Sequence, residues 1–362
     1  MMRLTTSMLF ALAVSGAAVA AQQPAIQNGQ VESRSTASID QAIASVGASV
    51  DPVWMGWRVP IVAGEHGGCN TWIDDAVYAR GLLLDDAVNG APGPSRPQFA
   101  PPAGPVALES GTGLVVLARV AGGRAERLHV IADDCPIDAG GRRVVWLGAV
   151  TPAESLRWLD GLTRPDAGAA LTPNARRNLA ATALSAIALH RDAGADAILD
   201  RIAANDDDAS LRQQAQDALG TLRGAHGFAT LRALLASTQA PDTRRQLVTA
   251  LGQTRERETV EALRPFLKDA DPKVRAAAVY AFAARGGPAV VPDVRQVIDA
   301  DPDASVRTRA VSGLARLPAD TSVPLLIELA GHKDAGVRKE AVTLLGRSDD
   351  PRARTFLQSL LK

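Results

Sequence analysis

Hydrophobic positions in the second half of the chain recur with a period of about 31 residues, and arginines mark the register. Seven residues after each repeat arginine stands a large apolar residue, and the eighth is small. A further aliphatic residue follows nineteen positions after each arginine. Agreement of three registers over five copies indicates an internal repeat. The repeat arginines are Arg212, Arg244, Arg275, Arg307 and Arg338, and the small residues are Gly220, Gly252, Ala283, Ala315 and Gly346.

Within one copy the apolar residues have helical spacing. Val274, Ala278, Val279 and Phe282 share one face of a helix, and a glycine- and proline-containing break separates them from a second amphipathic run over 290–298. Each copy therefore predicts a helical hairpin, in which the small residue lets the two helices approach closely. Hairpins of this kind bury their apolar faces by stacking, which predicts an all-α solenoid over residues 173–362. An earlier copy that lacks the arginine brings the number of hairpins to about six.

An aspartate stands four residues before four of the repeat arginines, beginning with Asp208 before Arg212, where its carboxylate caps a helix N-terminus. The resulting Asp-x-x-Val-Arg pattern contains Asp271, Asp303 and Asp334. It resembles the HEAT repeat family, and most closely the short bacterial HEAT-like repeats also found in phycobilisome lyases. The resemblance covers about residues 174 to 362. It implies that the aspartates and arginines bond one repeat to the next. Separately, the segment 135–141 with Trp146 resembles the strand-rich front part of exported bacterial HEAT-repeat proteins.

Two enzymatic relatives of this repeat type provide a test for activity. Deoxyhypusine hydroxylase resembles the array in fold and holds two irons with His-Glu pairs, but this sequence contains no such pair. The array histidines His190, His226 and His332 do not share one repeat position. Phycobilin lyases are cytoplasmic, which conflicts with an exported chain. The pattern favours a protein that is not an enzyme, and we expect no cofactor.

The first half alternates between apolar and polar residues, which is typical of strands. Two such runs flank a Gly-Gly turn and predict a β-hairpin over 114–132, and further strands are expected at 53–62 and 143–147. A proline-rich loop covers 90–105, and a capping box at Thr151 and Glu154 opens a bridging helix over 152–163. We expect a β-rich domain over 51–165. Residues 22–50 are polar and are expected to be loosely ordered, with at most one short helix over 39–46. The fold class is thus a two-part α+β chain.

The extreme N-terminus has the pattern of a secretory signal peptide. Arg3 precedes an apolar run that ends in a small-x-small site, which predicts cleavage after Ala20 or Ala21 and a signal peptide over residues 1–21. This run is too short and too rich in alanine for a membrane span, which needs about 20 apolar residues, and no later run is suitable. The sequence predicts a periplasmic or secreted protein without a membrane span.

Charge narrows the choice of partner. The chain has 39 basic and 39 acidic residues, so it lacks the concentrated positive charge that nucleic acid requires. Twenty residues after three repeat arginines stand Arg232, Arg264 and Arg295, which stacking would align. This row is either a solvated face, partly neutralised by Glu261 and Asp293, or a contact strip for an acidic partner protein. We expect a scaffold that binds another protein.

The remaining candidate chemistry surrounds the two cysteines of the chain, Cys69 and Cys135. His66 precedes Cys69 by three residues in the stretch EHGGC, so a thiol nucleophile with a histidine base is one reading. A second interpretation is a zinc site in which His129 joins His66, Cys69 and Cys135 as a ligand. A single Cys69–Cys135 disulfide fits an exported domain better. The alternative function is therefore an enzyme or metal-binding protein with a site around His66, Cys69, Asp134 and Cys135.

Aromatic residues crowd the same part of the sequence. Trp54, Trp57 and Trp72 lie on either side of the glycine-rich stretch, and Tyr78 follows. Core packing is the expected role of most of them, because they are the largest apolar side chains of the front half.

Overall fold

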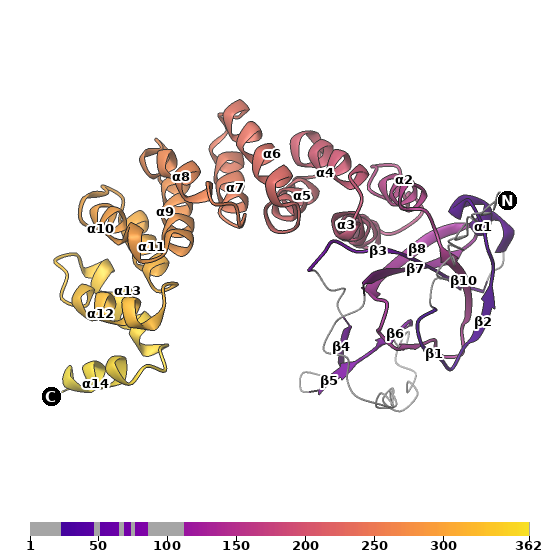
Figure 1. Cartoon of the computed structure of the whole chain (residues 1–362), viewed down its shortest axis with the longest axis horizontal. Coiled ribbons are helices and arrows are strands. Elements are labelled where there is room, and N and C mark those ends of the chain that lie inside the picture. Colours follow the sequence, from indigo (N-terminus) through magenta and orange to yellow (C-terminus); the bar gives the residue numbers. More distant parts are fainter. Residues whose placement is uncertain (1–22, 47–50, 65–68, 74–76, 86–111, 362) are drawn as a thin grey trace, which may run out of the picture.

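The computed structural model describes residues 23–46, 51–64, 69–73, 77–85 and 112–361. Strands gather at one end of the molecule, and the helices continue from them as a curved row to the C-terminus (Figure 1). Among these residues no helix is both long and apolar enough to cross a bilayer. The predicted proline-rich loop over 90–105 lies outside the described residues.

A five-stranded sheet forms the centre of the front part. The predicted hairpin is its β7–β8 pair, closed by Gly122 and Gly123, whose φ angles of 55° and 71° lie in the left-handed region. β3 runs antiparallel to β7 and parallel to β10. The strand order is β2 (Gln30–Ser33), β10 (Arg143–Ala149), β3 (Val53–Pro60), β7 (Gly113–Ala121) and β8 (Arg124–Ala132).

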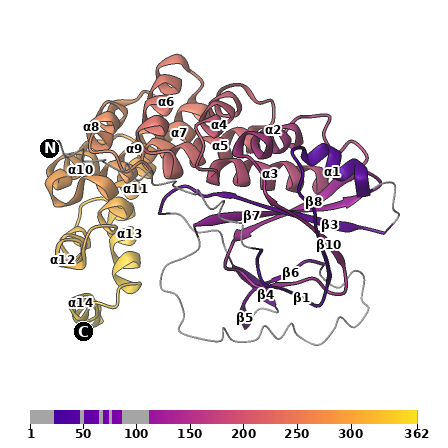
Figure 2. The same ribbon diagram turned by 45° about the vertical axis from the view of Figure 1, so that its right-hand side comes forward.

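Both faces of this sheet are covered, as Figure 2 shows. Met55 and Trp57 of β3 point into a core shared with the helices, whereas Trp54 points into a second core on the opposite face. Smaller sheets cover that opposite face: β1 (Ile26–Gln27), β9 (Ile137–Asp138) and β6 (Leu82–Leu83) form one, and β4 (Asn70–Ile73) and β5 (Val77–Arg80) form the other.

The expectation that residues 22–50 are loosely ordered is wrong for the strands at 26–33, whereas the short helix over 39–46 is present as predicted. β1 pairs in parallel with β9, and β2 pairs in parallel with β10. Helix α1 (Ile39–Val46) buries Ile39 and Ile43. The polar side chains of this segment do not prevent order because main-chain hydrogen bonds to neighbouring strands hold it in place.

The bridging helix α2 (Pro152–Leu162) begins as predicted, with the Thr151 side chain accepting a hydrogen bond from the Glu154 amide. The Glu154 carboxylate does not complete a capping box at Thr151. It accepts a 2.8 Å hydrogen bond from the amide of Ile39 instead. Glu154 thereby docks the N-terminus of α1 on α2.

A buried polar chain connects the sheet to the helices. Trp57 Nε1 donates to Ser155 Oγ at 2.9 Å, and Ser155 Oγ lies 2.9 Å from His190 Nε2. His190 Nδ1 lies 2.7 Å from the carbonyl of Ala186, so this nitrogen carries the proton and Nε2 accepts from the serine hydroxyl. All three side chains are fully buried. Because this row of hydrogen bonds connects β3, α2 and the end of α3 (Pro173–Leu189), it fixes the front part to the first helical repeat.

The helices after residue 172 form successive hairpins. First helices lie along the inner side of the curve and second helices along the outer side (Figures 1 and 2). The first helices are α3 (Pro173–Leu189), α5 (Ala209–Leu222), α7 (Pro241–Leu251), α9 (Pro272–Gly286), α11 (Ala304–Leu314) and α13 (Ala335–Gly346). The second are α4 (Gly194–Asn205), α6 (Gly224–Ser237), α8 (Thr259–Leu263) with the 3-10 turn Arg264–Lys268, α10 (Val291–Ala300) after the turn Gly287–Val290, α12 (Ala319–Leu329) and α14 (Pro351–Ser359).

The small residues of the repeat act between hairpins rather than within one. A Cβ on Gly220 of α5 would collide with the carbonyl oxygen of Ala250 on α7, and one on Gly252 would collide with Ala281 of α9. The close approach inside a hairpin lies at Gly227, where a Cβ would overlap the Leu219 carbonyl. The predicted close contact therefore exists, but it joins neighbouring first helices.

Candidate functional site

The two cysteines form a disulfide with a Cα–Cα distance of 5.3 Å. Cys135 is fully buried, and Cys69 packs against the same core. A disulfide leaves no thiolate for nucleophilic attack or zinc binding, so the alternative site built on Cys69 and Cys135 as free thiols is wrong for this state of the protein. His66 lies outside the described residues.

The other candidate residues near the disulfide pack in the cores or lie at the surface. The ring of His129 stacks on Trp54, with 5.1 Å between ring centroids, and Asp134 is exposed. Trp54 and Trp57 are fully buried in the two cores. Within the part of the chain that the structure describes, no three His, Cys, Asp or Glu residues are arranged to hold a metal ion.

The repeat arginines link successive hairpins. Arg275 Nη1 donates to the carbonyl of Asp269 at 2.9 Å, and its Nε and Nη2 donate to the Asp301 carboxylate at 2.8 and 3.0 Å. Arg307 repeats this arrangement with the carbonyl of Asp301 and the carboxylate of Asp334. Each arginine thus joins the entry to its own helix to the entry of the next first helix. The ion pair with Asp301 raises the pKa of Arg275.

This arginine–aspartate ladder consists of Arg244–Asp269, Arg275–Asp301 and Arg307–Asp334. Asp271, Asp303 and Asp334 cap their helices as expected. In two of the three links, however, the acid stands two residues before the cap, and the sequence analysis overlooked these two aspartates. Arg212 and Arg338 donate to backbone carbonyls.

The outer arginines, Arg232, Arg264 and Arg295, lie on successive second helices. Arg264 donates to Glu261 and Asp293, each at 3.0 Å, and Arg295 pairs with Glu328 of the next repeat. Arg232 lies over the ring of Phe228 at 5.4 Å. Two of the three outer arginines are therefore already neutralised by neighbouring carboxylates.

A hollow of about 630 Å³ lies on the inner side of the solenoid, across α7, α9 and α11. Its floor is made of small residues, including Ala276, Ala277 and Ala284. No carboxylate lines it. We call this site the inner hollow; its charged and aromatic lining residues are Arg245, Lys273, Tyr280, Arg285, Arg309 and Arg316. The sequence analysis missed it because these cations occupy different positions in the repeat.

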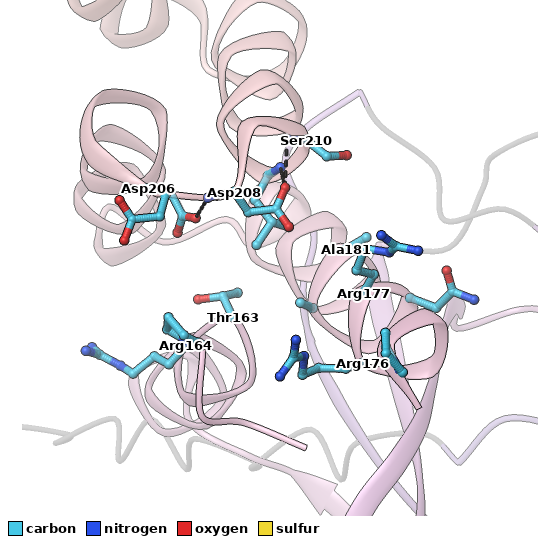
Figure 3. Close-up of a pocket in the computed structure, with 14 residues that line it drawn as sticks. Thr163, Arg164, Arg176, Arg177, Ala181, Asp206, Asp208 and Ser210 are labelled. Atoms are coloured by element: carbon cyan, nitrogen blue, oxygen red, sulfur yellow. Dashed lines mark hydrogen bonds between the residues drawn. The ribbon is translucent and has the colours of Figure 1, made fainter. Parts of the chain in front are cut away.

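A second cavity of about 620 Å³ lies where α2, α3 and α5 meet (Figure 3). Arg164 and Arg176 lie on the opposite side of it from Asp206 and Asp208. Asp208 caps α5 by accepting from the Ser210 amide at 2.8 Å, and the Asp206 carboxylate accepts from the Asp208 amide at 2.9 Å. Arg164 pairs with Asp160. Three of these charged side chains thus already serve the local fold, which makes the inner hollow the stronger candidate for ligand binding.

Comparison with known proteins identifies the repeat. The family model of HEAT repeats matches residues 228–314 and 291–362. No curated protein matches the sequence. Solved structures with similarity include YibA of Escherichia coli (23% identity, 46% of this chain and 64% of that chain, TM-score 0.34) and human deoxyhypusine hydroxylase (21%, 57% and 78%, 0.32).

A third is the complex of CpcE and CpcF of phycocyanin lyase from Nostoc (19% identity, 56% of this chain and 80% of that chain, TM-score 0.33). These similarities are too weak to bear on activity. The family model and the repeated helical hairpins agree with the sequence prediction. Residues 228–362 thus match the family model of HEAT repeats.

Proposed function

We propose that this protein is an exported scaffold whose HEAT-repeat solenoid binds another protein on its inner side. The observation that carries the proposal is the inner hollow, where four arginines without a carboxylate within 4.0 Å among the described residues surround a lining of alanines. Solenoids use their extended concave surfaces to hold partners. Alanine side chains keep the floor accessible to the main chain of a partner.

The inner side is a better candidate than the outer arginines. A partner that used Arg264 or Arg295 would have to displace Asp293 or Glu328, which already neutralise them. No such displacement is needed in the inner hollow, where Arg245 and Arg316 have no carboxylate within 4.0 Å among the described residues. The outer strip remains a rival that the same experiment tests.

Export and domain organisation belong to the same proposal. A disulfide is consistent with an oxidising compartment. We propose removal of a signal peptide after Ala20 or Ala21, a β-rich domain over 51–165 stapled by the disulfide, and a solenoid over 173–362 in which HEAT-like hairpins begin with α3. N-terminal sequencing of the protein recovered from periplasm and medium tests the cleavage, and thiol counting under denaturing conditions tests the disulfide.

Site-specific photocrosslinking tests the binding face. Benzoylphenylalanine replaces Thr249, an exposed residue that lines the inner hollow, or Ala233, an exposed residue of the outer helix α6. We expect a defined protein adduct from position 249 in the native compartment. The adduct is identified by mass spectrometry, and the purified partner is then titrated calorimetrically against the wild type.

The titration is repeated with charge reversals on each side. Reversal of the inner cations Arg245, Arg309 and Arg316 to glutamate should weaken binding of the partner more than reversal of the three outer arginines. Adducts formed only from position 233, or stronger dependence on the outer arginines, would replace the inner side with the outer strip.

A further inference from the structure

Most cations of the inner hollow differ from the arginines of the arginine–aspartate ladder in having no carboxylate within 4.0 Å among the described residues, and Lys273 is the exception. Lys273 has Asp242 at 3.9 Å, and both side chains are mostly exposed. Arg309 lies over the ring of Tyr280, 3.9 Å from its centroid. For Arg245 and Arg316 the described residues offer no carboxylate within 4.0 Å. The ladder arginines Arg244, Arg275 and Arg307 each have one.

Arg285 completes the set from the C-terminal end of α9. Its Nε donates to the carbonyl of Gly252 at 2.7 Å, and its Nη2 donates to the carbonyl of Gln253. Burial, followed by the positive charge of Arg255, lowers the pKa of Arg285. Like charges concentrated in a concave surface create a positive potential that attracts an anion.

Two carboxylates on the neighbouring first helices have hydrogen-bond partners of their own. Glu340 of α13 accepts a 2.7 Å hydrogen bond from Ser312, and Asp217 of α5 is half-buried beside Gln213 and Gln253. Neither residue lines the hollow. The cations that line the hollow come from α7, from α9 and from α11 with the residues just after it.

We propose that the inner hollow binds an extended acidic segment of the partner protein, with aspartate or glutamate side chains reaching the cations of α7, α9 and α11. This inference rests on the proposed function and specifies the chemistry of the partner. Neighbouring packed helices lie about 10 Å apart, so three helices span roughly 20 Å. About six extended residues at about 3.3 Å each cover that distance.

The lining favours a peptide over a single-stranded nucleic acid. Single strands are held by a basic groove together with aromatic side chains on which bases stack. Tyr280 is the one aromatic residue among those that line the hollow, and Arg309 lies over its ring. Carboxylates need only the cations, and a peptide main chain fits over the alanine floor.

Fluorescence anisotropy tests the inference with three labelled probes: an eight-residue peptide of alternating glutamate and serine, the same peptide with lysine in place of glutamate, and an eight-nucleotide thymidine strand. We expect the full-length protein to bind the glutamate peptide in preference to the other two. The triple variant R245E/R309E/R316E should weaken this binding at least about tenfold.

The matched control is R257E/K268E/R354E, which changes the net charge equally at exposed cations that do not line the hollow. It should change the affinity less than about threefold, because these exposed charges do not line the hollow and are screened by solvent and salt. Circular dichroism checks folding, and R245Q/R309Q/R316Q removes the positive charges without adding negative ones if the reversal variant unfolds. Arg285 is left intact because it holds backbone carbonyls.

Three results would overturn the inference: no preference for the glutamate peptide, equal losses in the hollow and control variants, or tighter binding of the thymidine strand. If a partner is crosslinked at position 249 while the glutamate peptide fails to bind, the acidic segment is wrong and the proposed binding face stands. If position 249 captures nothing and the peptide binds, the proposed function is wrong and the affinity of the hollow for acidic peptides stands.

Discussion

Replacement of Ser155 by alanine tests the connection between the sheet and the solenoid. The Ser155 hydroxyl accepts from Trp57 and lies 2.9 Å from Nε2 of His190, and all three side chains are fully buried. Alanine leaves the indole N–H and the imidazole Nε2 without these partners. An unsatisfied buried polar group costs about 1–3 kcal/mol, so two such groups predict a loss of roughly 3 kcal/mol in the free energy of unfolding.

The assay is urea denaturation followed by tryptophan fluorescence. Trp57 reports on this site directly, because its ring packs edge-on against Trp158 with 5.2 Å between centroids. The control is Ser237→Ala, which removes an exposed hydroxyl that donates to the Leu234 carbonyl, and it should change stability by less than about 0.5 kcal/mol. If Ser155→Ala is no more destabilising than this control, the buried polar chain does not hold the two parts together.

Three further predictions concern protonation, the ladder and helix spacing. Burial lowers the pKa of His190. The neutral imidazole therefore contributes fully to the free energy of unfolding above the unfolded pKa of about 6.5, and this contribution is lost as pH falls below that value, by at most about 1.4 kcal/mol per pH unit. His190→Gln should flatten the acid limb of a stability-versus-pH curve, and an unchanged limb would contradict this. Arg275→Ala breaks a largely buried ion pair with Asp301 and should lower the free energy of unfolding, measured by urea denaturation, by roughly 3 kcal/mol. The control, Arg338→Ala at an exposed site, should lower it by less than about 1 kcal/mol. Equal losses would show that the inter-repeat pair is unimportant. Gly220→Ala drives a methyl group into the backbone of α7 and should lower stability by about 1–3 kcal/mol, visible as a lower melting temperature, whereas a neutral result would mean that the helices separate at little cost.

Charged groups surrounding His190 are included in the pH prediction. The nearby Asp192 carboxylate favours protonation of the imidazole, and Arg223, which donates to the His190 carbonyl at 2.9 Å, opposes it. Burial is the largest of these influences. Comparison of the wild type with His190→Gln at each pH isolates the histidine from the other titrating groups.

The repeat could be predicted from the sequence because each position has the same environment in every copy. Helix caps such as Asp303 depend on residues two and three positions away, so local spacing identifies them. The ladder acids could not be identified in the same way. Asp301 meets Arg275 only because one hairpin stacks on the next, and this stacking geometry brings together residues that lie 26 positions apart.

The front half was harder to predict for a similar reason. Alternation revealed β3, β7, β8 and β10, whose side chains enter a core. β1 and β2 are short, polar and held by main-chain pairing to strands that follow more than 100 residues later. Side-chain contacts such as Asn28–Asp138 and Glu32–Arg143 also join residues more than 100 positions apart, so local spacing does not identify them. The disulfide was accessible to prediction because two cysteines permit one intramolecular pairing.

The inner hollow shows how one residue type takes two roles in this solenoid. Arg244 and Arg245 are adjacent in sequence, but consecutive helical residues point about 100° apart. The first therefore reaches Asp269 of the next repeat, while the second lines the hollow. Paired arginines add little to the distant field because their charge is neutralised locally. The arginines without a carboxylate partner consequently determine the electrostatic character of the inner side, and they affect the choice of partner and the rate of encounter more than the final affinity. Tight binding then requires that the partner also bury apolar surface on the alanine floor, so an acidic segment with small side chains between its carboxylates matches both parts of the site.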